Sequence, residues 1–511
     1  MKFLKIPAMS GAPKRPNIIL ISTDQQRTDT LGCYGSDFMK TPVIDKLASE
    51  GVRFDRAYCS SSVCTPSRAS LFTGVYPSRH GAWHVGTHVP EDIPMLSHRL
   101  SAEGYRTHYV GKAHFQSFLG DPKITAESLQ PDGRYPDWKG PYYGFETVEL
   151  SIGHGLYGHR NGHYSSWLQE RSGQKEPIFP DNTECAPFGG EAIDWDIPTE
   201  WHSSTWTSER ASAFLEEASE DEPFFLTVSF QDPHHPHALP SDCPCRVEPS
   251  TVPPPIRKEG ELDDKPEHFG DTARGLVEKW AKRGSYAFTA QTGNPPLNQL
   301  STDDTQKSRA HYYGMVQLID RSLGKVMETL ERRGMTENTL IIFLSDHGEL
   351  LGDHGLWFKG PFHYESIVKV PLIMHWPAGL EGGRAVDSPV GLVDIVPSVL
   401  AAAGIPGDDS LDGESLLPVA TNEGSCRGEA YVELVDDPKR IRLRTIVTKD
   451  WKMTWYAGEE FGELYHLAED PNEFVNHWDD PKCAVIKAQL LSRLLNYTEC
   501  NERREVRHTS S

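Results

Sequence analysis

The stretch Asn17-Ile18-Ile19-Leu20-Ile21-Ser22-Thr23, written NIILIST, predicts a buried β-strand. Its centre is an unbroken apolar run rich in isoleucine, and the polar residues Asp24-Gln25-Gln26 follow at once. A short, uniformly apolar run of this kind is typical of a parallel strand that is covered on both faces. We therefore interpret it as a central strand whose carboxyl end opens into a polar loop.

Two further stretches repeat this arrangement of an apolar strand with a polar ending. Pro223 to Phe230 (PFFLTVSF) runs into Gln231-Asp232-Pro233-His234, and Thr339 to Ser345 (TLIIFLS) runs into Asp346-His347-Gly348-Glu349. Helical patterns lie between the strands, at Ser97 to Glu103, Thr207 to Glu217 and Ala310 to Arg333. Strands that alternate with helices predict an α/β fold with a large, mainly parallel sheet flanked by helices. Because such sheets bind ligands beyond the carboxyl ends of their strands, the Asp, His and Gln side chains there predict a functional site.

The character of the sequence also changes along the chain. Residues 1–13 are predicted to be a flexible N-terminus and residues 14–404 a large α/β domain. Within that domain, residues 120–200 lose their periodicity but are rich in Gly, His and aromatic residues, which predicts a pocket-forming insertion. Shorter β-like runs and a helix from about Pro481 to Tyr497 follow. They predict a smaller α+β domain with an antiparallel sheet and a tail over residues 405–511.

Charge and composition restrict the partners. The 511 residues carry a formal net charge of −22 at pH 7, which excludes a nucleic-acid partner because such partners normally require a basic surface. A small anionic substrate remains compatible, since a few buried cations can dominate the field inside a pocket. The opening residues MKFLKIPAMSGAPKRP are too short for a secretory core, and no apolar run of transmembrane length follows. These observations predict no membrane partner and a cytoplasmic location, or a periplasmic or secreted one if a signal peptide was removed.

One cysteine stands in an unusual setting, the stretch SSVCTPSRAS from Ser61 to Ser70. Cysteine acts in catalysis as a thiolate, which nearby cations stabilise. Arg68 could supply such a charge, and a helix over Thr65 to Thr73 would place its positive N-terminus near Cys64. Taken alone, however, the pattern favours a buried structural cysteine ahead of a helix whose first turn contains Pro66.

Motifs along the rest of the chain change this interpretation. Cys64 to Arg68 (CTPSR) matches C-x-P-S-R and is followed by Leu71 to Gly74 (LFTG). More segments match in order between about Pro16 and Pro481: PSRHG at 77–81, GKAH at 111–114 in place of the usual GKWH, PHHP at 233–236, SDHG at 345–348, GDHGLW at 352–357 with Lys359, and ELYHL at 463–467 with the residues up to Asn476. Together they resemble the type I, formylglycine-dependent sulfatases of the alkaline-phosphatase-like superfamily, near the arylsulfatase and phosphonate monoester hydrolase branch.

The resemblance implies a chemistry for Cys64. A formylglycine-generating enzyme would oxidise it to formylglycine (3-oxoalanine), an aldehyde that hydrates to a geminal diol. One hydroxyl would attack sulfur to give a covalent sulfo-enzyme intermediate, and the other, once deprotonated, would expel sulfate. The resemblance also implies that residues 14–404 form the catalytic domain, and it implies these roles: Arg68 orients the diol, Lys112 and Lys359 hold sulfate oxygens, His114 takes a proton during sulfate release, and His234 protonates the leaving alcohol with help from Lys359.

A divalent metal ion is implied in the same way. Its expected ligands are Asp24, Gln25, Asp346 and His347, together with the residue derived from Cys64. Gln25 departs from the usual Asp, although a subset of the family has the Asp-Gln pair; the change lowers the charge of the site. Mostly oxygen donors favour Ca²⁺, and the imidazole of His347 leaves Mn²⁺ and Mg²⁺ as alternatives.

Two substrate classes stay open. The first is a small anionic sulfate ester, hydrolysed as by an arylsulfatase. The alternative is a phosphonate monoester or phosphodiester hydrolysed at the same site, as in some formylglycine enzymes with the Asp-Gln pair. A non-catalytic binding protein on this scaffold would show a broken set of residues, whereas every expected position is filled. A hydrolase that uses the unmodified thiol gives no reason for Asp24, Asp346 and His347 to converge.

Further contacts are left open as well. The following histidines lie near the matched motifs or in the 120–200 insertion and are candidate substrate contacts: His154, His159, His163, His235, His237 and His354. C-terminal helices of related enzymes reach a partner subunit. The tail from Cys483 to Ser511 therefore suggests the hypothesis of a homo-oligomer, a dimer or a tetramer.

Overall fold

The computed structural model describes residues 15–131, 133–154, 158–174, 192–282, 300–407, 409–437 and 441–501. The flexible N-terminus expected at 1–13 lies outside these residues, as do positions 132, 155–157 and 175–191 of the 120–200 insertion. None of the helices in the described ranges combines the length and the apolar character needed to span a bilayer.

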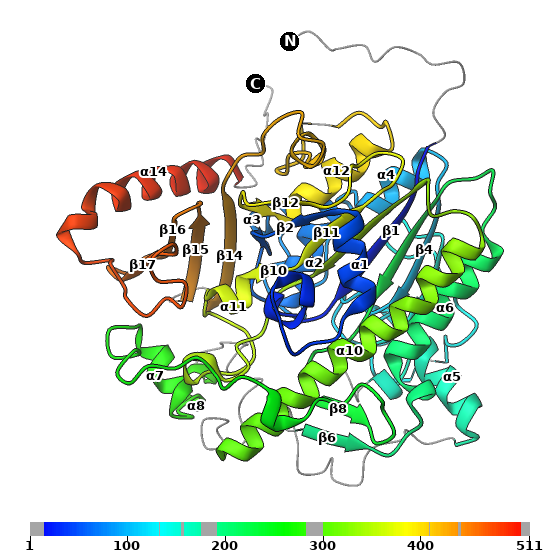
Figure 1. Ribbon diagram of the computed structural model, residues 1–511, viewed down its shortest axis with the longest axis horizontal. Coiled ribbons are helices and arrows are strands. Elements are labelled where there is room, and N and C mark those ends of the chain that lie inside the picture. The colour runs from blue at the N-terminus through cyan, green and yellow to red at the C-terminus, as the bar shows by residue number, and fades with distance from the viewer. Residues whose placement is uncertain are drawn as a thin grey trace.

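An eight-stranded sheet forms the centre of the molecule (Figure 1). In spatial order its strands are β12 (Arg384–Val386), β2 (Val52–Phe54), β11 (Leu372–His375), β9 (Thr339–Ser345), β1 (Asn17–Thr23), β7 (Phe224–Ser229), β4 (Arg106–Gly111) and β5 (Thr147–Leu150). Neighbouring strands from β9 to β5 are all parallel, and β11 is antiparallel to both β9 and β2. The predicted α/β fold with a mainly parallel sheet is therefore confirmed.

The opening stretch NIILIST coincides with β1 and lies in the middle of this sheet. Ile18 and Leu20 belong to the core on one face, whereas Ile19 and Ile21 belong to the core on the other. Fully burying one such side chain is worth about 1.5–3 kcal/mol. An apolar run that is buried on both faces therefore fixes this stretch as a central strand.

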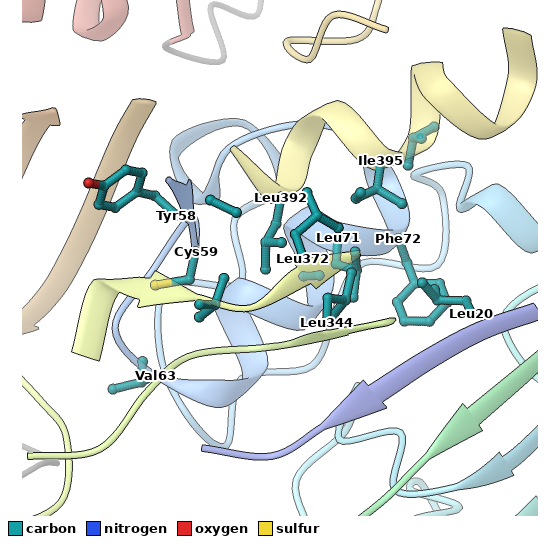
Figure 2. Packing of buried hydrophobic residues seen from close by; sticks show 14 of the residues in the cluster. Leu20, Tyr58, Cys59, Val63, Leu71, Phe72, Leu344, Leu372, Leu392 and Ile395 are labelled. Atoms are coloured by element: carbon teal, nitrogen blue, oxygen red, sulfur yellow. The ribbon is translucent and has the colours of Figure 1, made fainter. Parts of the chain in front are cut away.

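Helices cover both faces of the sheet (Figure 1). One face packs against α1 (Pro42–Glu50), α6 (Ser203–Glu217) and α10 (Thr302–Arg332). The other packs against α2 (Cys64–Thr73), α4 (Leu96–Ala102) and α12 (Ile395–Ala402). Figure 2 shows the core on the second side, where Leu71 and Phe72 of α2 gather with Leu20, Leu344 and Leu372 of the sheet.

Two helices begin earlier than their apolar periodicity predicts. The α10 helix starts at Thr302 rather than Ala310, because the Ser301 hydroxyl accepts a hydrogen bond from the backbone N–H of Asp304 at 3.1 Å and caps the helix. Its first two turns are largely polar and so carry no apolar pattern. Likewise α6 starts at Ser203 rather than Thr207, after a cap by the His202 side chain.

The C-terminal region forms a separate antiparallel sheet of β14 (Ala430–Asp437), β15 (Ile441–Val447), β16 (Trp451–Tyr456) and β17 (Gly462–His466). Val432 and Leu443 face the core of the large sheet, whereas Ile446 and Met453 pack with Leu490 of α14 (Ala484–Asn501). The predicted smaller unit with an antiparallel sheet is confirmed. Its boundary at residues 404 and 405 stays a prediction.

Shorter elements complete the fold. The helices are α3 (Pro77–His80), α5 (His163–Ser172), α7 (Glu267–Ala273), α8 (Glu278–Ala281), α11 (Glu365–Val368) and α13 (Leu417–Ala420). The 3₁₀ turns are η1 (Thr28–Thr30), η2 (Gly32–Tyr34), η5 (Thr199–Trp201), η6 (Pro249–Thr251), η8 (Asp353–Gly355), η9 (Leu392–Asp394) and η10 (Pro481–Cys483). Two small sheets pair β10 (Lys369–Val370) and β13 (Val390–Gly391) with β3 (Ala57–Tyr58), and β6 (Ala192–Trp195) with β8 (His237–Pro240).

Candidate active site

Five adjacent parallel strands deliver polar residues to one edge of the large sheet. In spatial order, β9 is followed by Asp346 and His347, β1 by Asp24 and Gln25, β7 by His234, β4 by Lys112 and His114, and β5 by His154. This is the edge at which open parallel sheets bind ligands. The structure thus gathers the site residues predicted from the strand endings.

Cys64 is the first residue of α2, and it is buried among these strand ends. Its Sγ lies 3.0 Å from Lys359 Nζ, 3.2 Å from His347 Nε2 and 3.7 Å from Asp24 Oδ1. Burial and the Asp24 carboxylate raise the pKa of the thiol, but Lys359 and Lys112 outweigh them, so that the pKa lies below its usual value. Cys64 therefore occupies an electropositive position rather than an apolar structural one.

Cys64 and three neighbouring side chains form a candidate metal site. The ligand atoms of Asp24, Cys64, Asp346 and His347 all lie within 4.8 Å of one another. The Nδ1 of His347 is 2.9 Å from the carbonyl oxygen of Gly348, which can only accept, so this nitrogen carries the proton. The lone pair of Nε2 is then free to face the centre of the group. Carboxylate oxygens and an imidazole nitrogen are a donor set that fits a divalent cation.

Gln25 lies at the edge of this group. Its backbone has a φ of 70°, an uncommon conformation for a side-chain-bearing residue. The amide oxygen accepts from Lys359 Nζ at 2.5 Å, while the amide nitrogen donates to the Glu349 carboxylate and to His235 Nδ1, the latter at 3.1 Å. Three partners therefore fix the orientation of the amide. The expectation that its oxygen also binds the metal stays a prediction.

Arg68 clamps the two site carboxylates together. Its Nε donates to Asp346 Oδ2 at 2.7 Å, and its Nη2 donates to Asp24 Oδ2 at 3.3 Å. The remaining nitrogen, Nη1, bonds the carbonyl of Lys112 at 2.8 Å and the hydroxyl of Ser229 at 3.0 Å. All these groups are buried. Arg68 thus directly orients the two carboxylates of the candidate metal site.

Lys112 follows the last residue of β4 and points into the same cluster. Its ammonium pairs with Asp24 Oδ2 and lies 2.5 Å from His154 Nδ1. Burial lowers the pKa of Lys112, and the Asp24 carboxylate opposes that shift. Gly111 makes the approach feasible because it has a φ of 103°, and a Cβ there would lie 1.8 Å from the Ser229 carbonyl oxygen.

His234 and Lys359 form a hydrogen-bonded pair. The His234 Nδ1 donates to the carbonyl oxygen of His235 at 2.5 Å, so its Nε2 is free to accept from Lys359 Nζ at 2.8 Å. Burial, followed by the charge of Lys359, holds the pKa of His234 well below its usual range. The ring is therefore neutral and shares a lysine proton.

His114 is placed differently. It is buried, has a φ of 58°, and its ring lies 5.3 Å from that of His154 in an edge-on arrangement. Neither of its ring nitrogens has a hydrogen-bond partner within the described ranges. Burial and then the charge of Lys112 hold its pKa well below the usual range. A buried polar group without a partner is typical of a position that a ligand completes.

The sequence did not assign Glu349 to the site, and it indicated His154 and His235 only as candidate substrate contacts. Their signal is position, because each lies within a few residues of a strand end that carries a predicted site residue. The other candidate histidines are engaged elsewhere. His354 pairs with Glu261, His237 bonds Ser308, His163 bonds Trp138, and His159 packs on Trp195.

Comparisons with known proteins agree with this geometry. The sulfatase family profile matches residues 16–405, and the profile described as N-sulphoglucosamine sulphohydrolase, C-terminal, matches residues 352–500. The uncharacterized sulfatase YidJ of Escherichia coli K12 is 32% identical over 495 residues, which cover 95% of this chain and 88% of that protein. An arylsulfatase of Clostridium perfringens is 27% identical over 478 residues, 90% of each chain.

A solved structure is similar over the same length. The phosphonate monoester hydrolase of Agrobacterium radiobacter superposes with a TM-score of 0.76 at 25% identity, over 95% of this chain and 96% of that one. The protein is thus an ester hydrolase of the alkaline-phosphatase-like superfamily. Within that class, it belongs to the sulfatase family, as its motifs predicted.

Proposed function

We propose that the protein hydrolyses sulfate esters at the site around Cys64. The observation that carries the proposal is the convergence of Lys359, His347 and Asp24 on the Cys64 sulfur, at 3.0, 3.2 and 3.7 Å. A sulfate ester needs preorganised positive charge around the oxygens of the group that is transferred. Lys112 and Lys359 supply this positive charge beside the carboxyl ends of the sheet strands.

Two groups would complete the site. A formylglycine-generating enzyme would convert Cys64 to formylglycine, whose hydrate supplies one hydroxyl that attacks sulfur and a second whose deprotonation expels sulfate. One of its two oxygens would replace the Cys64 Sγ, and the other would replace a hydrogen of the same carbon. A divalent cation, Ca²⁺ in preference to Mn²⁺ or Mg²⁺, held by Asp24, Asp346 and His347 with Gln25 at the edge, would supply charge to the substrate and lower the pKa of the hydroxyl.

The protein's own residues would handle the substrate and the protons. Lys112 and Lys359 would bind terminal oxygens of the sulfate group. The proton that Lys359 Nζ shares with His234 Nε2 would be donated to the leaving alcohol. His114 is neutral and its ring nitrogens have no hydrogen-bond partner among the described residues, so it would accept the proton released when sulfate departs. Arg68 would hold Asp24 and Asp346 in place throughout.

Hydrolysis of phosphonate monoesters or phosphodiesters is the second candidate. The likeness to the Agrobacterium phosphonate monoester hydrolase and the Asp24-Gln25 pair favour it. The two substrates differ at one position, because a sulfate ester presents three terminal oxygens and a phosphonate ester two oxygens and a carbon. A donor that faces the carbon would stay unpaired, which costs about 1–3 kcal/mol. A site lined by hydrogen-bond donors therefore favours the sulfate ester.

The state of Cys64 tests the nucleophile. Protein from its native host, or from a host that also expresses a formylglycine-generating enzyme, would be alkylated at its thiols and digested with trypsin. The peptide Ala57 to Arg68 contains Cys59 as an internal standard. We expect one alkylated thiol, at Cys59, and the mass of an aldehyde at residue 64. Two alkylated thiols from a host that matures other sulfatases would exclude this mechanism.

Activity then tests the substrate class. The kcat/KM values of the mature enzyme for 4-nitrophenyl sulfate and for a 4-nitrophenyl phenylphosphonate ester would be compared at equal metal concentration. The leaving group is the same, so the ratio reports the transferred group alone. We expect the sulfate ester to be preferred by about 10–100-fold, the equivalent of one unpaired donor. A preference for the phosphonate would establish the second candidate instead.

A further inference from the structure

Three histidine rings form a continuous stack beside the proposed nucleophile. The rings of His154 and His234 are 3.9 Å apart and 5° from parallel, and those of His234 and His235 are 4.1 Å apart at 29°. Phe358 closes the far end, 4.0 Å from His235. His234, proposed above to act with Lys359, is the central ring and is therefore held from both sides.

Each ring of the stack also contacts one polar group of the site. His154 Nδ1 lies 2.5 Å from Lys112 Nζ, His234 Nε2 lies 2.8 Å from Lys359 Nζ, and His235 Nδ1 lies 3.1 Å from the Gln25 amide nitrogen. In all three pairs the partner is a donor, so the ring nitrogen is the acceptor. The rings are thus neutral acceptors that direct the N–H groups of two lysines and one amide.

His154 holds a distinct place in this arrangement. It lies just beyond β5, whereas His234 follows β7 and His235 comes next in the chain. It is half-buried, as are His235 and Lys359. It links Lys112 to His234, because its Nδ1 contacts Lys112 and its face contacts His234.

We propose that His154 is a positioning residue, which fixes the ammonium group of Lys112 through Nδ1 and the ring of His234 through stacking. The proposal rests on the sulfate ester hydrolysis proposed above. It assigns two separable effects to one side chain. The hydrogen bond would set how tightly the sulfate group is held, and the stacking would set how well the leaving alcohol is protonated.

Two substitutions separate these effects. His154→Phe keeps a planar ring against His234 but removes the acceptor for Lys112. His154→Asn removes the ring but keeps an acceptor, since the Asn Oδ1 is the same number of bonds from the backbone as the His Nδ1. His466→Phe and His466→Asn, in the C-terminal antiparallel sheet, are matched controls for the substitutions themselves.

The variants would be compared in the mature, metal-loaded enzyme. Readouts are KM and kcat for 4-nitrophenyl sulfate and phenyl sulfate, inhibition by inorganic sulfate, and the melting temperature. For His154→Phe we expect KM and the inhibition constant of sulfate to rise by about 10–100-fold for both esters, the effect of one lost charge-assisted hydrogen bond. For His154→Asn we expect the inhibition constant to return to within about threefold of wild type, while the rate advantage of 4-nitrophenyl over phenyl sulfate grows about tenfold or more.

Several outcomes would overturn the proposal. It fails if both variants retain wild-type kinetics, or if both lose activity equally for the two esters with no rescue of sulfate binding in His154→Asn. In the latter case His154 would be only structural or a direct substrate contact. An unsubstituted enzyme with no activity on either ester would instead refute the proposed function, so the two failures are distinguishable.

Discussion

The substitution Arg68→Lys tests whether Arg68 acts on the metal site or on the reacting group. The resemblance to sulfatases implies that Arg68 orients the diol at residue 64. In the structure its guanidinium instead bridges Asp346 Oδ2 at 2.7 Å and Asp24 Oδ2 at 3.3 Å. Lysine keeps the positive charge but offers a single nitrogen, which cannot bridge both carboxylates and also reach the Lys112 carbonyl.

The size of the effect follows from these contacts. A lysine at this position retains one carboxylate contact and loses the other, and a hydrogen bond to a charged group is worth about 1.5–3 kcal/mol. That loss corresponds to about a 10–150-fold weaker affinity for the divalent cation. Substitution of residues that orient metal ligands has typical effects of about 10–100-fold on metal affinity, which agrees.

Metal affinity and turnover must be measured separately. Apo-enzyme prepared with a chelator would be titrated with Mn²⁺ by calorimetry, and kcat would then be measured at saturating metal. We expect the dissociation constant for Mn²⁺ to rise by about 10–150-fold. At saturating metal, we expect kcat to fall by less than about tenfold. Arg427→Lys, at a half-buried arginine that pairs with Asp394 far along the chain, should leave the metal affinity unchanged. An unchanged metal affinity in Arg68→Lys with a collapsed kcat would refute the clamp and favour action on the reacting group.

Three further predictions concern stability and the metal. Lys452→Met should destabilise the fold by about 3–5 kcal/mol, because the half-buried carboxylate of Glu365 and the buried carboxylate of Glu473 lose the cation that pairs with both. Adding Glu473→Gln should recover at least half of the loss in urea unfolding, and no recovery would contradict the ion-pair argument. Acid should destabilise the protein below about pH 6.5, because burial depresses the folded pKa of several histidines under the unfolded value of about 6.5. These are His80, His108, His159, His237 and His363, each with a pKa of about 3, and His163, with a pKa of about 4. Stability is then complete above pH 6.5 and lost at about 1.4 kcal/mol per histidine for each pH unit below it; a urea midpoint that stays constant from pH 7 to pH 5 would contradict this. Chelation with EDTA should abolish ester hydrolysis and lower the melting temperature, with recovery on adding Ca²⁺ or Mn²⁺, whereas full activity in metal-free protein would exclude the metal site.

The fold was predictable where burial is uniform. The runs at Asn17–Thr23 and Thr339–Ser345 match β1 and β9 residue for residue, because a strand buried on both faces must be apolar throughout. Helix starts were less predictable. The first turns of α10 project polar side chains, so the apolar period appears only after the Ser301 cap has already started the helix.

The gathering of the motif residues at the strand ends was predictable, and His154 was a candidate substrate contact, but its contact with Lys112 was not predictable. His154 lies in a stretch with no clear periodicity, and nothing in the sequence relates it to Lys112. Strand register supplies the relation: Gly111 at the end of β4 pairs with Leu150 at the end of β5. Residues just beyond these two ends are therefore neighbours, and Lys112 meets His154 although 42 positions separate them. Pairing of this kind between two parallel strands is not encoded in either segment alone.

The amide at Gln25 makes the two lysines of the site unequal. Lys112 pairs with Asp24, so part of its charge is already neutralised within the protein. Lys359 contacts the neutral Gln25 amide, the Cys64 sulfur and the neutral His234 ring, and no carboxylate in the described part of the chain forms an ion pair with it. A carboxylate at position 25 would share that charge. With an amide there, the Lys359 ammonium is not paired with a carboxylate at position 25, and in the proposed mechanism it would face residue 64 and the bound ester, where negative charge develops in the transition state.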